Sequence, residues 1–205
     1  MSQRALDLFV QNFGDAVKAT GSSHGDEWAR VDGARIQAMA SFLKNDPALE
    51  MKLLADLTCV DYLEFDPQKR LALDDPERFE VVYHFASVTT RERLSLKVRC
   101  GGAEEIVVPS ITGVFRTANW WERLVWDFFG VRFEGHPDLR RILTYEEFKG
   151  HALRKDYPIH LRQPLTPERR VQDLIRGPGP GPSSLHAPMS QRPGARPNVK
   201  ADDYD

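Results

Sequence analysis

The sequence predicts an α+β fold: a single domain in which helices pack on a mixed, largely antiparallel sheet. Its 205 residues suit one hydrophobic core better than two. Apolar residues recur at helical spacing in two N-terminal segments, and segments rich in β-branched and aromatic residues follow them. Helices and strands grouped in this way are typical of an α+β sandwich.

The two N-terminal helices are the first predicted elements. The first ends near Gly14, which stands where a C-terminal cap would fall. Its apolar face consists of Leu6, Phe9, Val10 and Phe13. The second spans about residues 33–44 and stops before Pro47. Its apolar face consists of Ile36, Met39, Ala40 and Leu43.

Three strands are predicted next, over residues 57–60, 79–88 and 93–98. All three are rich in residues that favour strands, and the last shows clear alternation of apolar and polar side chains. A loop that contains Gly21, Ser22 and Ser23 is expected between the two N-terminal helices.

A third helix is predicted over residues 116–129. Thr117 or Asn119 would cap its start, and Gly130 its end. Its apolar stripe consists of Ala118, Trp121, Leu124, Val125 and Phe128. Arg123 and Asp127 lie four residues apart, so we expect a surface ion pair between them. Residues 144–147 (TYEE) resemble a capping box that opens a short helical turn.

Composition divides the chain into three parts: a core domain (residues 1–130), an extended segment (131–176) and a tail (177–205). The tail has six prolines and four glycines among 29 residues. With almost nothing apolar to offset the entropy of ordering it, the tail is expected to be flexible and disordered.

Several functional classes are disfavoured by composition. No apolar run approaches the roughly 18 residues of a membrane span, and the N-terminus lacks the pattern of a secretory signal, so a cytoplasmic protein is expected. Cys59 and Cys100 form no CxxC pair, which leaves too few thiolates for an iron-sulfur cluster or a zinc ribbon. A formal net charge of -2 argues against nucleic acid as a partner.

Catalytic motifs are not found. No GxSxG elbow and no phosphate-binding glycine loop is present. A metal-dependent site centred on His136 and Asp138 is the enzymatic alternative, but no HxxxH or HExxH supports it. The sequence from Gly135 to Asp138 (GHPD) is instead good turn chemistry.

A protein-docking surface is favoured over residues 139–170. Eight Lys and Arg residues stand there against four Asp and Glu residues. Apolar residues are interspersed with too little periodicity to be buried in the chain's own core: Leu139, Ile142, Leu143, Leu153 and Ile159. Exposed apolar anchors beside guanidinium groups are typical of protein interfaces. Nucleic acid is the competing partner, but stacking aromatics are sparse in this segment and no RNP, KH or helix-turn-helix signature is present.

One stretch carries a family resemblance. Residues 121–159, WERLVWDFFGVRFEGHPDLRRILTYEEFKGHALRKDYPI, resemble the signature region of the C subunit of NADH-quinone oxidoreductase, the thirty-kilodalton subunit family of respiratory complex I. The pattern upstream, including Asp61-Tyr62 and residues 109–112 (PSIT), is also similar. Leu124 replaces a second Glu of the family motif, Ala152 replaces a Pro, and residues after Ile159 do not align to the family's extension.

The resemblance implies a non-catalytic structural subunit in the peripheral arm of a proton-translocating complex that transfers electrons from NADH to quinone. It implies no cofactor in this chain, because FMN, iron-sulfur clusters and quinone belong to other subunits, and an isolated chain without activity. The implied partners are chiefly the D subunit and also the B and I subunits, with no nucleic acid. The implied location is peripheral, on the cytoplasmic side of the bacterial inner membrane, with membrane association only through the complex.

Two sets of residues follow from this interpretation. The expected partner-docking residues are His136, Asp138, Arg140, Arg141, Arg154, Lys155, Asp156 and Tyr157. The expected structural residues are Glu122, Arg123, Asp127, Gly130, Gly135 and Pro137. The alternative hosts for the same surface are a membrane-bound hydrogenase or a related quinone-reducing complex.

Overall fold

The structure is a computed structural model that describes residues 3–63, 77–101, 106–160 and 163. The chain divides into two compact units, residues 1–161 and residues 162–205. The second unit contains a single described residue, Gln163. The predicted tail and the end of the predicted extended segment therefore lie outside the described residues.

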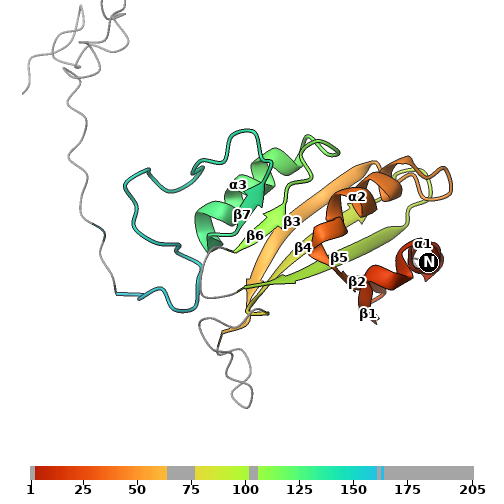
Figure 1. Cartoon of the computed structure of the whole chain (residues 1–205), viewed down its shortest axis with the longest axis horizontal. Coiled ribbons are helices and arrows are strands. Elements are labelled where there is room, and N and C mark those ends of the chain that lie inside the picture. Colours follow the sequence, from red (N-terminus) through yellow and green to blue (C-terminus); the bar gives the residue numbers. More distant parts are fainter. Residues whose placement is uncertain (1–2, 64–76, 102–105, 161–162, 164–205) are drawn as a thin grey trace, which may run out of the picture. The chain divides into compact units, whose positions relative to one another are not determined.

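The described part of the first unit contains three α-helices, two 3₁₀ turns and seven strands (Figure 1). The helices and turns are α1 (Gln3–Phe13), η1 (Gly14–Ala16), η2 (Gly33–Arg35), α2 (Ile36–Asn45) and α3 (Ala118–Phe129). The strands are β1 (Val17–Ser23), β2 (Asp26–Val31), β3 (Leu53–Asp61), β4 (Phe79–Ala86), β5 (Arg93–Cys100), β6 (Val107–Pro109) and β7 (Arg132–Glu134).

Five strands form one mixed sheet in the order β1-β2-β5-β4-β3. The pair β2-β5 is parallel, and the other neighbouring pairs are antiparallel. This confirms the predicted mixed, largely antiparallel sheet. The hairpin β1-β2 stands where a loop that contains Gly21, Ser22 and Ser23 was predicted. These strands were not predicted, because their sequences contain many polar residues. In β2 only alternate side chains from Glu27 to Val31 are buried, so the apolar signal is weak.

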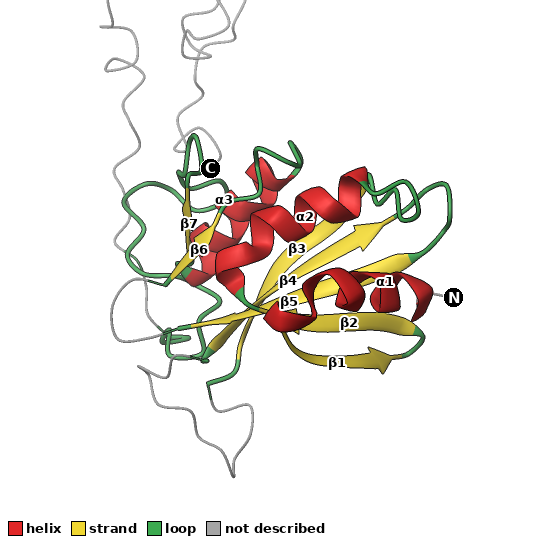
Figure 2. Cartoon of the chain, turned by 45° about the vertical axis from the view of Figure 1, so that its right-hand side comes forward, coloured by secondary structure: helices red, strands yellow, loops and turns green. Residues whose placement is uncertain are grey.

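The hydrophobic core lies on the face of the sheet that α1 and α2 cover (Figure 2). Both helices bury the stripes predicted for them, including Phe9 from α1 and Met39 from α2. The sheet contributes alternate residues such as Tyr83 and Leu96, which pair across β4 and β5. Each fully buried side chain of this size contributes roughly 1.5–3 kcal/mol, so the packing of these faces determines the fold.

The helix α3 begins two residues later than predicted and packs mainly against β3. Gly130 ends it in the left-handed conformation (φ 75°) and donates its N–H to the carbonyl of Trp126, as predicted for a C-terminal cap. The predicted N-terminal cap is wrong in part, since Thr117 occupies that position without a side-chain hydrogen bond to the helix.

Residues after 130 belong to the same compact unit as the sheet. The strand β7 pairs with β6 in a small parallel sheet, and Val131 and Phe133 are buried in the main core. This compact unit extends to residue 161. Among the helices within residues 3–63, 77–101 and 106–160, none has the length and apolarity needed to span a bilayer.

Candidate functional site

The candidate site is the irregular segment that follows β7, residues 135–160, which we call the strap. It contains all eight predicted docking residues and consists of turns and extended backbone without regular elements. A segment of this kind has few hydrogen bonds of its own, so its conformation depends on partners elsewhere in the chain. Most of these partners are side chains and carbonyls of α3.

Asp127 is the main anchor of the strap. It is fully buried, and its Oδ2 accepts N–H bonds from three successive residues, Ile142 (3.2 Å), Leu143 (2.9 Å) and Thr144 (3.0 Å). Its Oδ1 accepts the Thr144 hydroxyl and the Arg141 guanidinium (2.8 Å). Burial raises the pKa of this carboxyl, but the bonds from Thr144, Leu143 and Arg141 outweigh it and hold the pKa well below its usual range.

Arg141 closes the strap on itself. Its side chain is only 13% exposed and donates to Asp127, to Thr144, and to the carbonyls of Phe148 (2.9 Å) and Gly150 (3.0 Å). The expectation that this arginine is available to a partner is therefore corrected. Arg140 does point outward: its side chain is 68% exposed, and among the described residues its ion-pair partner is Asp138, which is itself 56% exposed.

The predicted surface ion pair between Arg123 and Asp127 is wrong. Both side chains are buried, because the strap covers the helix edge that they share. Arg123 donates instead to the carbonyls of Arg140 and Arg141, each at 3.1 Å. Both helix residues thus bind the same part of the strap. Arg123 binds its backbone carbonyls, and Asp127 binds its backbone amides.

The helical turn predicted at residues 144–147 is reduced to one hydrogen-bonded turn, in which the Phe148 N–H donates to the Tyr145 carbonyl (3.0 Å). Thr144 does not act as the expected capping residue, because its hydroxyl donates to Asp127. The buried carboxylate offers a charge-assisted bond, which is stronger than a neutral capping bond.

The C-terminal carbonyls of α3 are also satisfied by the strap. The His151 Nδ1 donates to the Asp127 carbonyl (2.9 Å), and the Arg154 Nε donates to the Phe129 carbonyl (2.5 Å). Burial lowers the pKa of His151 below its ordinary value. Both side chains lie directly over Gly130, where an added Cβ would collide with Arg154 Nη2 and with the His151 ring. The glycine is therefore needed both for its φ and for this close approach.

The far end of the strap is fixed to the sheet by an ion-pair cluster around the buried Arg78 and Asp61. Arg78, which is 3% exposed, donates to both carboxylate oxygens of Asp61 at the end of β3 and to Asp156 (2.5 Å). The backbone N–H of Lys155 also donates to Asp61 (2.9 Å). Burial raises the pKa of Asp61, but the bonds from Arg78 and Lys155 prevail and lower it.

This cluster was missed at the sequence level. Arg78 and Asp156 are 78 positions apart, and neither lies in a periodic pattern. The sequence signal that could have indicated the cluster is the position of Arg78, a charged residue directly before the apolar strand β4. Tyr157, a predicted docking residue, is half-buried and stacks on Phe148 with ring centroids 5.8 Å apart.

His136 and Asp138 hold the first turn of the strap. The Asp138 N–H donates to His136 Nδ1 (3.0 Å), so the other nitrogen, Nε2, carries the proton and donates to the Asn119 carbonyl (3.1 Å). Neither ring nitrogen has a lone pair to offer a metal. In the described parts of the chain, no three His, Cys, Asp or Glu residues are grouped to hold one. Gly135 takes φ 80° at this turn, beside Pro137.

The outer side of the strap exposes apolar residues among charged ones of both signs, since Asp138, Glu146, Glu147 and Asp156 are exposed there as well. Leu143 (68% exposed), Leu153 (51%) and Ile159 (90%) project from it, as predicted. Leu139 and Ile142 differ, being half-buried against the unit. Arg140, Lys149 and Lys155 are exposed among the apolar residues. The inner side of the strap is thus bonded to the rest of the chain, whereas side chains on its outer side are exposed. This arrangement suits binding of another protein surface.

Glu122, a predicted structural residue, supports the neighbouring loop. Its carboxyl is fully buried and accepts bonds from the Ser110 hydroxyl (2.6 Å) and the Ile111 N–H (2.8 Å). Burial raises its pKa to about 7, against the lowering effect of these two bonds. Such a carboxyl in a cleft is a candidate acid or base. Its full burial and its bonds within the chain favour a structural role.

The chain is similar to known subunits of NADH-quinone oxidoreductases. Residues 29–163 match the family model described as respiratory-chain NADH dehydrogenase, 30 Kd subunit. An NADH-quinone oxidoreductase C subunit (C 2) of Rhizobium etli (strain CIAT 652) is 43% identical over 150 residues, which cover 73% of this chain and 74% of the relative. The NADH-quinone oxidoreductase C subunit of Rhodobacter capsulatus is 38% identical over 184 residues, 86% of each chain.

A solved structure shares the fold. A chain of the membrane-bound sulfane sulfur reductase, an archaeal respiratory membrane complex, superimposes with a TM-score of 0.59 at 22% sequence identity. The match covers 77% of this chain and 86% of that chain. The family match includes α2, β3–β5, α3 and the whole strap, so the candidate site lies inside the region of similarity.

Proposed function

The chain belongs to the respiratory-chain NADH dehydrogenase, 30 Kd subunit family, and on this premise we propose that it is a non-catalytic structural subunit of the peripheral arm of a proton-translocating NADH-quinone oxidoreductase. In this proposal the whole complex transfers electrons from NADH to quinone, while other subunits hold FMN, the iron-sulfur clusters and quinone. The chain docks beside the D subunit, with the B and I subunits nearby, on the cytoplasmic side of the bacterial inner membrane.

The observation that carries the proposal is the division of the strap into two sides. Its inner polar groups are bonded to Asp127, Arg123 and Arg78, whereas apolar anchors on its outer side remain exposed. Because the strap is already ordered, a partner that covers it loses little conformational entropy on binding. A catalytic site would instead need polar groups free to contact a substrate.

The proposal assigns different tasks to the predicted docking residues. Arg141, Arg154 and Asp156 position the strap through bonds within the chain. Direct contact with the D subunit is assigned to the exposed side chains, namely Arg140, Lys155, Leu143, Leu153 and Ile159.

Recovery of partner subunits with an affinity-tagged full-length chain tests this function. We expect Leu143→Asp combined with Leu153→Asp to leave the melting temperature of the chain nearly unchanged, because both side chains are exposed. Recovery of the D subunit should fall about tenfold, which corresponds to roughly 1.4 kcal/mol of binding free energy. Mass spectrometry of the co-purified proteins identifies the host complex.

Val88→Asp is the matched control, since Val88 is 77% exposed and lies in the turn between β4 and β5, outside the strap. Full recovery of NADH-quinone oxidoreductase subunits with the double variant would remove the strap from the interface. A wild-type chain that brings down no such subunits would overturn the function itself.

A further inference from the structure

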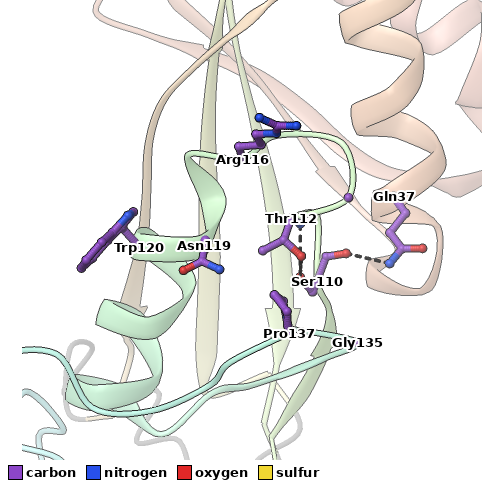
Figure 3. Close-up of a pocket in the computed structure, with 9 residues that line it drawn as sticks. Gln37, Ser110, Thr112, Arg116, Asn119, Trp120, Gly135 and Pro137 are labelled. Carbon is purple, nitrogen blue, oxygen red and sulfur yellow. Dashed lines mark hydrogen bonds between the residues drawn. The ribbon is translucent and has the colours of Figure 1, made fainter.

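A groove beside the start of α3 is separate from the outer anchors of the strap. It has a volume of about 590 Å³ and lies between the loop after β6, the first turn of α3 and the Gly135–Pro137 turn (Figure 3). This volume accommodates several side chains, since a water molecule occupies about 30 Å³.

The walls of the groove are held in place by internal hydrogen bonds. Gln37 of α2 donates its amide to the Ser110 carbonyl (2.6 Å), and the Ser110 hydroxyl lies 2.8 Å from that of Thr112 (Figure 3). The Ser110 hydroxyl also donates a hydrogen bond to the buried carboxyl of Glu122. The groove is therefore formed before anything binds, which lowers the cost of binding.

Arg116 is the single charged residue among those that line the groove. It is exposed, and within the described part of the chain its guanidinium has no hydrogen-bond or ion-pair partner. The arginines of the strap differ, since Arg140, Arg141 and Arg154 each have a bond within the chain. A guanidinium that has no partner among the described residues is complementary to one carboxylate of a ligand.

Trp120 supplies an apolar surface at the same site. Its side chain projects outward from the first turn of α3 (Figure 3) and is 61% exposed. The Arg123 guanidinium lies 5.0 Å from the centre of the Trp120 ring. An exposed tryptophan beside arginine is the composition most enriched at interface hot spots. The neutral amide of Asn119 and hydroxyl of Thr112 suit the backbone of an extended polypeptide better than a multiply charged small anion.

We infer that this groove receives an extended segment of a partner subunit, with an Asp or Glu carboxylate on Arg116 and an apolar side chain on Trp120. The inference rests on the proposed function, because the partner is another subunit of the same complex. It adds a second contact, distinct from the apolar anchors of the strap, and it states the chemistry of the segment that binds there.

Carbodiimide coupling in the purified complex tests the carboxylate directly. The reagent joins an amine to a carboxylate in contact with it, so Arg116→Lys converts the proposed ion pair into a cross-link. We expect one dominant cross-linked peptide between Lys at position 116 and an Asp or Glu of another subunit. Arg93→Lys, an exposed residue of β5, is the matched control and should give no dominant product.

Two further variants test the groove without cross-linking. Arg116→Glu reverses the charge, and Gly113→Leu fills the groove from a position where an added Cβ meets nothing within 4 Å and φ is not positive. Each should lower recovery of partner subunits about tenfold at an unchanged melting temperature, whereas Arg93→Glu should not.

The outcomes separate this inference from the proposed function. If the wild-type chain and the Lys variant both assemble but no cross-link to another subunit forms at position 116, the groove assignment fails and the proposed function stands. A cross-link to carboxylates of the same chain, or of a second copy of it, would also overturn the partner assignment. If the wild-type chain does not co-purify with any respiratory subunit, the function fails first.

Discussion

Two acidic residues of α3 show how the surroundings of a carboxyl determine its charge. Asp127 and Glu122 lie on one helix and are both fully buried. Asp127 accepts bonds from three backbone N–H groups, a hydroxyl and a guanidinium, so its charged form prevails. Glu122 accepts two bonds from neutral donors, and burial prevails. The number and charge of the donors decide the difference.

Glu122→Gln is predicted to change the pH dependence of stability. The pKa of Glu122 is about 7 in the folded chain against 4.5 for an ordinary Glu, so the folded state binds the proton more tightly. The free energy of unfolding contributed by this group should therefore be highest below pH 4.5 and fall as pH rises towards about 7. At about 1.4 kcal/mol per pKa unit, the loss is on the order of 3 kcal/mol.

Urea unfolding of wild type and Glu122→Gln at pH values from about 5 to about 8 measures this effect. The difference between the two proteins removes the contribution of other titrating groups, including His151, whose lowered pKa has the opposite influence on the acid side of this range. The variant should gain stability relative to wild type as pH rises. A difference that is constant across the range would show that Glu122 does not titrate there.

The strap and α3 depend on each other for stability, because each satisfies hydrogen-bonding groups of the other. The strap supplies donors to Asp127 and to the last carbonyls of the helix, and the helix supplies acceptors that the strap lacks. Gly130 permits this arrangement, since a side chain at that position would displace His151 and Arg154. Removal of one partner leaves buried charges unpaired, which is costly.

The two adjacent arginines of the strap should therefore behave differently when each is changed to Glu. Arg140→Glu should change the free energy of unfolding by less than about 1 kcal/mol, because its ion pair with Asp138 is exposed. Arg141→Glu should cost about 3–5 kcal/mol, since it sets a second carboxylate against Asp127 and leaves two carbonyls without their donor.

Urea unfolding and hydrogen exchange distinguish these outcomes. In Arg141→Glu the amides of Ile142, Leu143 and Thr144 should exchange faster than in wild type, while those of β4 change less. Equal stability of the two variants would mean that the bonds of Arg141 contribute little, and that both arginines are as free as the sequence suggested.

At the scale of the whole molecule, the proposed function predicts a chain without a cofactor of its own. The full sequence has two cysteines, fewer than the four thiolates that an iron-sulfur cluster usually requires, and no glycine-rich nucleotide loop. The purified full-length chain should show no visible absorption band and should not oxidise NADH. A flavin or iron-sulfur spectrum that co-elutes with the monomeric chain would contradict this.

Much of the fold could be predicted because its signals are local. The amphipathic faces of α1 and α2 and the β-rich segments of β4 and β5 lie close to their predicted positions, since periodicity depends only on neighbouring residues. The hairpin β1-β2 and the short pair β6-β7 were missed. The strands β1 and β2 contain many polar residues, and β6 and β7 have only three residues each. Pairing with other strands stabilises them more than intrinsic propensity does.

Motif spacing and apolar periodicity can be read along the chain, so they were enough to predict the α+β class, the family and the position of the candidate site. The role of each charged residue in that segment follows instead from tertiary contacts. Arg140 and Arg141 are adjacent and chemically identical, yet one faces solvent and the other binds Asp127. Burial and bonding partners depend on residues brought together from distant positions, as with Asp61, Arg78 and Asp156.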